Sequence, residues 1–112
     1  MQDGLLGRDA LVANVSSKVG SVDDNGSGGG YAYRASKSAL NIVTKSLSID
    51  LAGLGITATI LHPGWVVTRM TEMRGLITTE ESVSGMLNVL RSKTPEELNG
   101  AWYDFAGKVI PW

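Results

Sequence analysis

Two apolar, strand-like runs on either side of a long amphipathic segment constrain the fold of this 112-residue chain more than any other feature. Residues 11–15 and 56–61 are short, apolar and rich in β-branched side chains, as strands buried on both faces are. Between them, residues 31–51 carry apolar side chains at three- and four-residue spacing, which predicts a helix ended by Gly53 and Gly55. A strand, a crossover helix and a second strand form a right-handed βαβ unit. We therefore expect an α/β fold with a parallel sheet.

The remainder of the chain extends this pattern. Helical spacing predicts a second helix from residue 79 to residue 91, with Thr78 or Thr79 and two glutamates suited to its start. Residues 95–100 predict a short turn, and residues 101–105 a third strand. The sequence thus predicts about three strands and two main helices.

The helix over residues 31–51 has an unusually wide apolar stripe. One row consists of Leu40, Val43, Leu47 and Leu51, and a second row of small and apolar side chains lies beside it. A single contact surface needs a narrower stripe. We therefore expect this helix to have two neighbours, the second of which could be another copy of the chain.

Polar side chains with catalytic potential lie close to these elements. Ser16 and Ser17 follow the first strand, at the edge where open α/β sheets place their ligands. Tyr33 and Lys37 are four residues apart and share one helix face. A cation near a phenol favours the phenolate, which makes a tyrosine usable as an acid or base near neutral pH. Ser17, Tyr33 and Lys37 are therefore candidates for a proton-handling set.

Three other features compete for a functional role. Tyr31 is six residues from Lys37 and off its face, so we assign it to a loop or substrate side. We interpret His62, the only histidine, as a packed or hydrogen-bonded residue and not as a catalytic base. The glycine-rich residues 26–30 lie too far beyond the strand for a phosphate-binding loop, so we interpret them as a flexible loop near the substrate.

The combination of motifs resembles the short-chain dehydrogenase/reductase family. The motif Y-x-x-x-K at Tyr33 and Lys37 is preceded by the serine pair and followed by a P-G-x-V-x-T element at residues 63–68. The similarity is greatest to the branch of C-factor-like proteins and small carbonyl reductases. It implies that Tyr33 donates a proton to a carbonyl oxygen, while Lys37 assists it and binds the ribose of a nicotinamide cofactor. It also implies that Ser17 holds the substrate oxygen.

The same resemblance implies an NAD or NADP site. Its residues in this sequence are Tyr33, Lys37, Pro63, Gly64, Val66 and Thr68. The expected substrate is a small carbonyl compound or alcohol. The expected activity is NAD(P)-dependent carbonyl reduction or alcohol oxidation.

The resemblance covers residues 10–112, whereas the family usually needs more than twice this length. The glycine-rich turn of a dinucleotide-binding half is missing from the sequence. We therefore expect residues 1–112 to be a single partial domain, the C-terminal half of a Rossmann-like doubly wound sheet, without activity of its own. The alternative is a non-enzymatic, C-factor-like signalling or interaction polypeptide. Loss of Ser17, Tyr33 or Lys37 would favour it, and all three are present.

Composition argues against several other classes of protein. The net charge is −1 and the ten basic residues are scattered, which argues against nucleic-acid binding. No stretch approaches 18 apolar residues, so we expect a cytoplasmic protein that is not in a membrane. The absence of cysteine and the single histidine argue against disulfides and against a metal site.

Overall fold

A three-stranded parallel sheet forms the centre of the protein, which is described here by a computed structural model over residues 10–65 and 76–112. The strands are β1 (Leu11–Val15), β2 (Thr57–His62) and β3 (Trp102–Asp104), in the order β1-β2-β3. Leu11 pairs with Thr57, and Ile60 pairs with Trp102. The predicted α/β class, with a partial Rossmann-like sheet, is confirmed.

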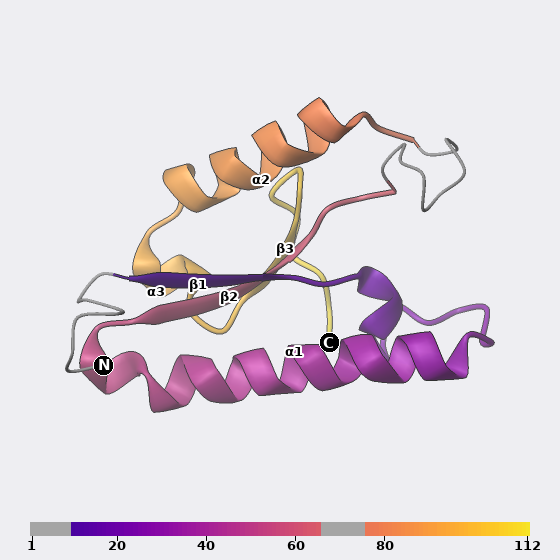
Figure 1. Cartoon of the computed structure of the whole chain (residues 1–112), viewed down its shortest axis with the longest axis horizontal. Helices are drawn as coiled ribbons and strands as arrows, with labels where there is room; N and C mark the ends of the chain where they lie inside the picture. The colour runs from indigo at the N-terminus through magenta and orange to yellow at the C-terminus, as the bar shows by residue number, and fades with distance from the viewer. Residues whose placement is uncertain (1–9, 66–75) are drawn as a thin grey trace.

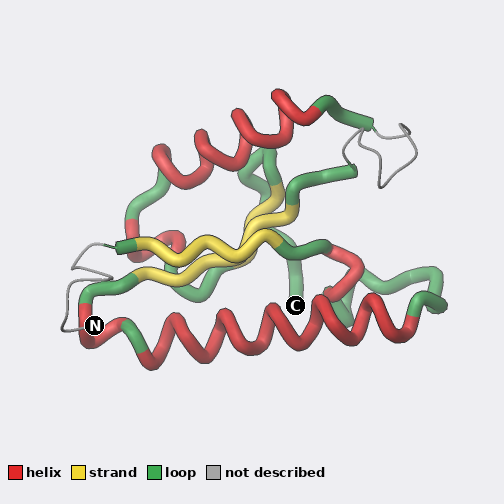
Figure 2. The backbone as a smooth tube through the Cα atoms, viewed as in Figure 1, coloured by secondary structure: helices red, strands yellow, loops and turns green. Residues whose placement is uncertain are grey.

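Helices cover the two faces of this sheet (Figure 1; Figure 2). The long helix α1 (Tyr31–Asp50) runs along one face, and α2 (Thr79–Ser92) lies over the other. The one-turn helix α3 (Pro95–Leu98) joins α2 to β3. The apolar core on the α2 side is formed by Leu61, Val89, Leu98 and Tyr103.

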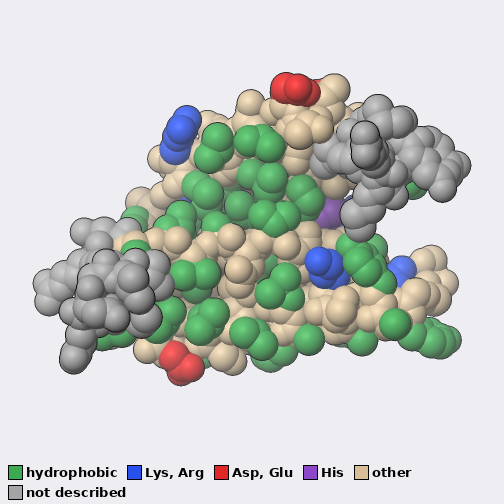
Figure 3. Space-filling view, in the orientation of Figure 1, with side chains coloured by type: hydrophobic (Ala, Val, Ile, Leu, Met, Phe, Trp, Pro, Cys, Tyr) green, Lys and Arg blue, Asp and Glu red, His purple; other side chains and the backbone are tan. Residues whose placement is uncertain are grey.

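The middle strand meets the expectation of burial on both faces. Ala58, Thr59, Ile60 and Leu61 of β2 are each at most 2% exposed. In contrast, Leu11 and Val15 of β1 are 40% and 51% exposed, because β1 pairs only with β2 in the described part of the chain. Figure 3 shows apolar side chains gathered between the two helices on one face of the molecule.

The prediction of which side of α1 contacts the sheet was wrong in one respect. The side chains buried against the rest of the protein are the polar Asn41, Thr44 and Ser48, whereas Val43 is 53% exposed. Thr44 can be buried because its Oγ1 accepts a hydrogen bond from Asn14 Nδ2 at 2.9 Å and donates one to the Leu40 carbonyl at 2.7 Å. Small polar side chains with local partners let the helix approach the sheet closely.

Several element boundaries also differ from the sequence-based expectation. Residues 95–100 were expected to form a turn, but Pro95–Leu98 form α3, which begins with a capping box between Thr94 and Glu97. The 3-10 turn η1 (Lys18–Gly20) was not expected. The second strand begins and ends one residue later than expected, and Gly55, with a φ of 75°, ends the 3-10 turn η2 (Ala52–Leu54) after α1.

The C-terminal segment folds back towards the residues that follow β1. Ile110 N donates to the Trp102 carbonyl at 2.9 Å, and Val22 N donates to the Trp112 carbonyl at 2.6 Å. The Ser21 hydroxyl also donates to the Pro111 carbonyl. These bonds bring the end of the chain beside the carboxyl ends of the strands.

We expect the isolated chain to self-associate. Besides the β1 edge, the outer side of α1 exposes Ile42 at 62% and Ile49 at 67%, and unpaired strand edges next to apolar surface favour association. Light-scattering chromatography would measure this. If α1 forms the contact, Ile42→Lys with Ile49→Lys should shift the chain towards monomer, whereas Asn88→Lys on the exposed side of α2 should not. A clean monomer at high concentration would contradict the prediction.

Candidate active site

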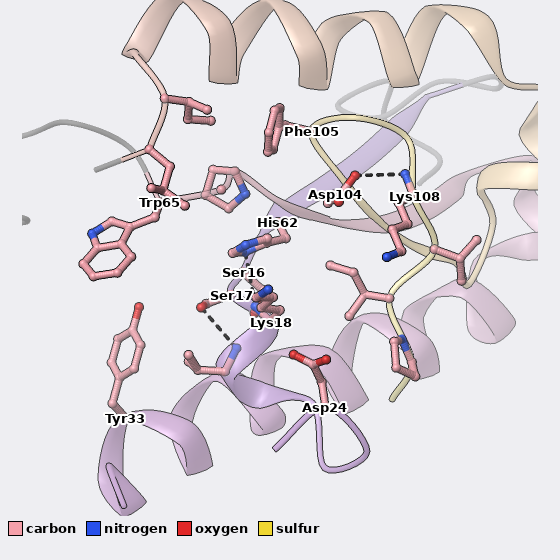
Figure 4. Close-up of a pocket in the computed structure, with 18 residues that line it drawn as sticks. Ser16, Ser17, Lys18, Asp24, Tyr33, His62, Trp65, Asp104, Phe105 and Lys108 are labelled. Carbon is pink, nitrogen blue, oxygen red and sulfur yellow. Dashed lines mark hydrogen bonds between the residues drawn. The ribbon is translucent and has the colours of Figure 1, made fainter. Parts of the chain in front are cut away.

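A cavity of about 810 Å³ opens at the carboxyl ends of the three strands (Figure 4). Ser16 and Ser17 enter it after β1, and His62 to Trp65 enter it at the end of β2. Asp104 and Phe105 line it at the end of β3, and Tyr33 reaches it from the first turn of α1. This is the edge at which an open parallel sheet binds ligands.

Ser17 is held at the point where β1 turns into η1. It is the N-cap of η1, and its Oγ accepts a hydrogen bond from Val19 N at 3.3 Å. A hydroxyl that accepts one bond retains its own hydrogen for donation. Ser16 also lines the cavity, but it is 3% exposed, and its Oγ has no hydrogen-bond partner in the described structure.

Tyr33 and Lys37 lie next to each other on α1, as their spacing predicts. The Lys37 Nζ is 5.5 Å from the centroid of the Tyr33 ring. Tyr33 is 48% exposed and lines the cavity, with its hydroxyl directed towards Trp65 in Figure 4. Lys37 is half-buried. The structure therefore brings Ser17 and Tyr33 into one cavity, with the Lys37 ammonium beside the phenol.

Tyr31 takes no part in this arrangement. It is 84% exposed at the start of α1, and it is not among the described residues that line the cavity. It lies away from the site, as its spacing from Lys37 indicated, but it is the first residue of α1 and not the loop or substrate-side residue that was expected.

The Pro63-Gly64 pair forms the cavity wall after β2. Gly64 has a φ of 83°, and a Cβ there would stand 2.7 Å from Ile77 Cδ1 and 2.9 Å from Phe105 Cδ1. Only glycine fits this position without strain. The neighbouring predicted residues Val66 and Thr68 lie outside the described residues.

Some residues around the cavity were not predicted from the sequence. Ser82 of α2 is 2% exposed and donates to the Pro63 carbonyl at 2.6 Å, which fixes the Pro-Gly turn to α2. Phe105, Val109 and Ile110 also line the cavity. No motif marks these positions, because they reach the cavity only when the C-terminal segment folds back.

His62 is hydrogen-bonded, in keeping with its interpretation as a packed residue. Its Nδ1 accepts a bond from Lys18 N at 3.2 Å. Burial lowers the pKa of His62 below its ordinary value, and the positive charge of Lys18 lowers it further, against the opposing effects of Asp104 and Asp24. A neutral imidazole is required, because a protonated Nδ1 cannot accept this bond.

The folded chain should therefore lose stability in mild acid. Because the pKa of His62 is lower in the folded than in the unfolded state, the loss of stability is absent well above the unfolded pKa of about 6.5. It grows as the pH falls from there towards the folded pKa and is constant below it. NMR titration should show the imidazole and the Lys18 amide shifting together, with a midpoint below that of a free histidine. Thermal unfolding of His62→Gln should be less dependent on pH between about pH 5 and 7.5 than that of the unsubstituted chain. A folded pKa above the free value would contradict this.

The described residues offer neither a membrane-spanning helix nor a cluster of metal ligands. None of their helices is both long and apolar enough to cross a membrane. Residues 10–65 and 76–112 also contain no group of three or more histidines, cysteines and acidic residues arranged to hold a metal ion.

Comparison with known proteins assigns the chain to a family. The short chain dehydrogenase family model matches residues 3–76. The chain is 42% identical over 112 residues to C-signal of Myxococcus xanthus, covering 100% of this chain and 65% of that protein. It is 38% identical over 112 residues to 1-hydroxy-2-glutathionyl-2-methyl-3-butene dehydrogenase of Rhodococcus sp. (strain AD45), covering 96% of this chain and 49% of that protein.

Solved structures of carbonyl reductases are also similar to this chain. The carbonyl reductase Sniffer of D. melanogaster superposes with a TM-score of 0.86 at 38% identity, over 99% of this chain and 45% of that one. The NADPH-bound carbonyl reductase from chicken fatty liver superposes with a TM-score of 0.83 at 38% identity, over 92% of this chain and 43% of that one. The chain thus spans between about two fifths and two thirds of the length of these relatives. By its sequence and its fold, this chain belongs to the short-chain dehydrogenase family.

Proposed function

We propose that this chain is the catalytic part of an NAD(P)-dependent oxidoreductase that interconverts a small carbonyl compound and its alcohol. The observation that supports this most is the shared cavity: Ser17 and Tyr33 both line it, and the Lys37 ammonium lies 5.5 Å from the Tyr33 ring. The names of relatives such as Sniffer and the chicken enzyme point to carbonyl reduction among the family's reactions.

The residues of the cavity are compatible with a nicotinamide ring. Gly64 leaves the backbone bare at a point where a Cβ would collide with Ile77 and Phe105. Ser16 contributes a buried hydroxyl that has no partner among the described residues. Tyr33, Lys37, Pro63 and Gly64 would hold the cofactor, together with Val66 and Thr68, for which the family motif is the support.

Each catalytic side chain has a distinct task in this proposal. A bound nicotinamide cofactor supplies the hydride that a carbonyl carbon accepts. The Tyr33 hydroxyl donates the proton that the carbonyl oxygen needs, and the Lys37 charge stabilises the phenolate that remains. Ser17 donates a hydrogen bond to the same substrate oxygen. Alcohol oxidation uses the same groups in reverse.

The cavity wall favours an apolar substrate. Trp65, Leu76, Phe105 and Val109 are among the residues that line it. Trp65 is 60% exposed and Leu76 is 84% exposed, so both would lose accessible apolar area when a substrate binds. We therefore include an apolar carbonyl substrate in the proposal.

In this proposal, activity requires a second half of the sheet that binds the dinucleotide. We take the 112 residues as the C-terminal half of a doubly wound sheet whose dinucleotide-binding strands would pair with β1. On its own, the chain should bind NAD(H) and NADP(H) no more tightly than about millimolar, because most contacts to a dinucleotide would come from the other half. Calorimetric titration with each nucleotide measures this. Low-micromolar binding by the isolated chain would show an autonomous domain and contradict the fragment hypothesis.

A further inference from the structure

We infer that Arg34 is a positioning residue that fixes the turn carrying Ser17 to the helix carrying Tyr33. The inference rests on the proposed function for the role of Ser17, and on the structure for the contacts. Arg34 immediately follows Tyr33 on α1. It belongs to neither the proton-handling set nor the cofactor set.

The guanidinium of Arg34 binds two separate segments at once. Its Nη1 donates to the Val19 carbonyl in η1 at 3.1 Å. Its Nε donates to the Gly29 carbonyl at 3.0 Å, and its Nη2 donates to the Ser27 Oγ at 3.1 Å and to the Gly28 carbonyl at 3.4 Å. A planar fork with five donors can reach all these acceptors, whereas the ammonium of a lysine cannot.

The glycine-rich loop is shaped around this side chain. Gly28, Gly29 and Gly30 have φ values of 70°, 70° and 58°, a left-handed run that only glycine adopts easily. A Cβ added to Gly26, Gly28 or Gly29 would meet no atom within 4 Å, so the loop has little packing of its own. The described side-chain hydrogen bonds between this loop and α1 all come from Arg34. Without them, the conformational entropy of several glycines would favour an open loop.

The other acceptor of Arg34, the Val19 carbonyl, belongs to the turn that holds Ser17. Val19, whose carbonyl accepts the bond from Arg34, also donates its backbone N–H to Ser17 Oγ at 3.3 Å. One turn further along α1, Ser38 Oγ donates to the Gly20 carbonyl at 2.6 Å. A Cβ at Gly20 would stand 2.9 Å from Lys37 Cβ, so the turn lies directly against α1. Arg34 is therefore part of the contact that sets the spacing between Ser17 and Tyr33.

Two measurements test this, one of them independent of activity. Hydrogen exchange of the 112-residue chain should show faster exchange of residues 18–30 in Arg34→Ala and in Arg34→Lys, with no change in Arg91→Ala on the exposed end of α2. In the complete enzyme, Arg34→Ala should lower kcat by about 10- to 100-fold, because a small misplacement of a reacting group has effects of this size. The cofactor dissociation constant should stay unchanged.

A double-mutant cycle separates positioning from general damage. If Arg34 acts through Ser17, its substitution should have little further effect in a Ser17→Ala background. Additive losses would overturn the inference, and so would unchanged exchange of residues 18–30. If Ser17→Ala left turnover intact, the proposed function and the positioning role would both fail. The exchange result would still decide whether the guanidinium holds the turn.

Discussion

Tyr33→Phe is expected to lower turnover by at least about 10²-fold, the range over which a general acid contributes. The substitution removes the only transferable proton of this side chain and keeps its ring beside the Lys37 ammonium, 5.5 Å away. Cofactor affinity should change little, so the loss should be mainly in kcat. Steady-state kinetics of the complete enzyme, with the dinucleotide-binding half supplied by fusion or by the full-length parent, measures it.

The chain offers a matched control for this substitution. Tyr31→Phe makes the same chemical change two residues away, at a side chain that is 84% exposed and outside the described cavity lining. It should leave kcat close to that of the unsubstituted enzyme. Retention of more than half of kcat in Tyr33→Phe would rule out Tyr33 as the proton donor.

Ser17→Ala has the second-largest expected effect. It should lower kcat/KM, with a loss of transition-state stabilisation of about 2–4 kcal/mol. This is the range for loss of one hydrogen-bond donor to a developing oxyanion. The substitution also removes the bond from Val19 N to Ser17 Oγ, which caps η1. Unfolding should therefore be measured in parallel, because loss of a cap alone costs about 1 kcal/mol of stability.

Ser16→Ala is the matched control within the serine pair. Its Oγ is buried without a described partner, so its removal breaks no hydrogen bond within the described structure. The kinetic loss should be smaller than that of Ser17→Ala. If the two losses were reversed, the assignment within the pair would be wrong.

Much of the fold could be predicted because it depends on local pattern. The β-branched run of β2 and the Tyr33–Lys37 spacing on α1 are properties of short segments, and they correctly predict a buried strand and two adjacent side chains. The contact face of α1 was harder to predict. Hydrophobicity favours Val43 as a buried residue, but Thr44 takes the buried position because Asn14, thirty residues earlier, satisfies its hydroxyl.

The residues of the candidate site also fall into those that the sequence could predict and those that it could not. Ser17 could be predicted as a site residue from its place after the first strand, and Tyr33 from its spacing to Lys37, and both line the cavity. Phe105 and Val109 were missed, since their place in the wall depends on the C-terminal segment bonding to Trp102 and Val22. Ser82 was missed because a polar residue on an apolar helix carries no local sign of a carbonyl partner such as that of Pro63.

The strand pairing also has a consequence for the rate of folding. Leu11 pairs with Thr57 and Ile60 with Trp102, so every described strand pair closes a loop of roughly forty residues or more. Hairpins, which form in microseconds and could start the sheet, are absent between these strands. A newly synthesised chain must therefore form α1 and search for distant partners while β2 stays exposed. We expect slow folding for a chain of this size, with the apolar run of β2 as the segment most in need of a chaperone.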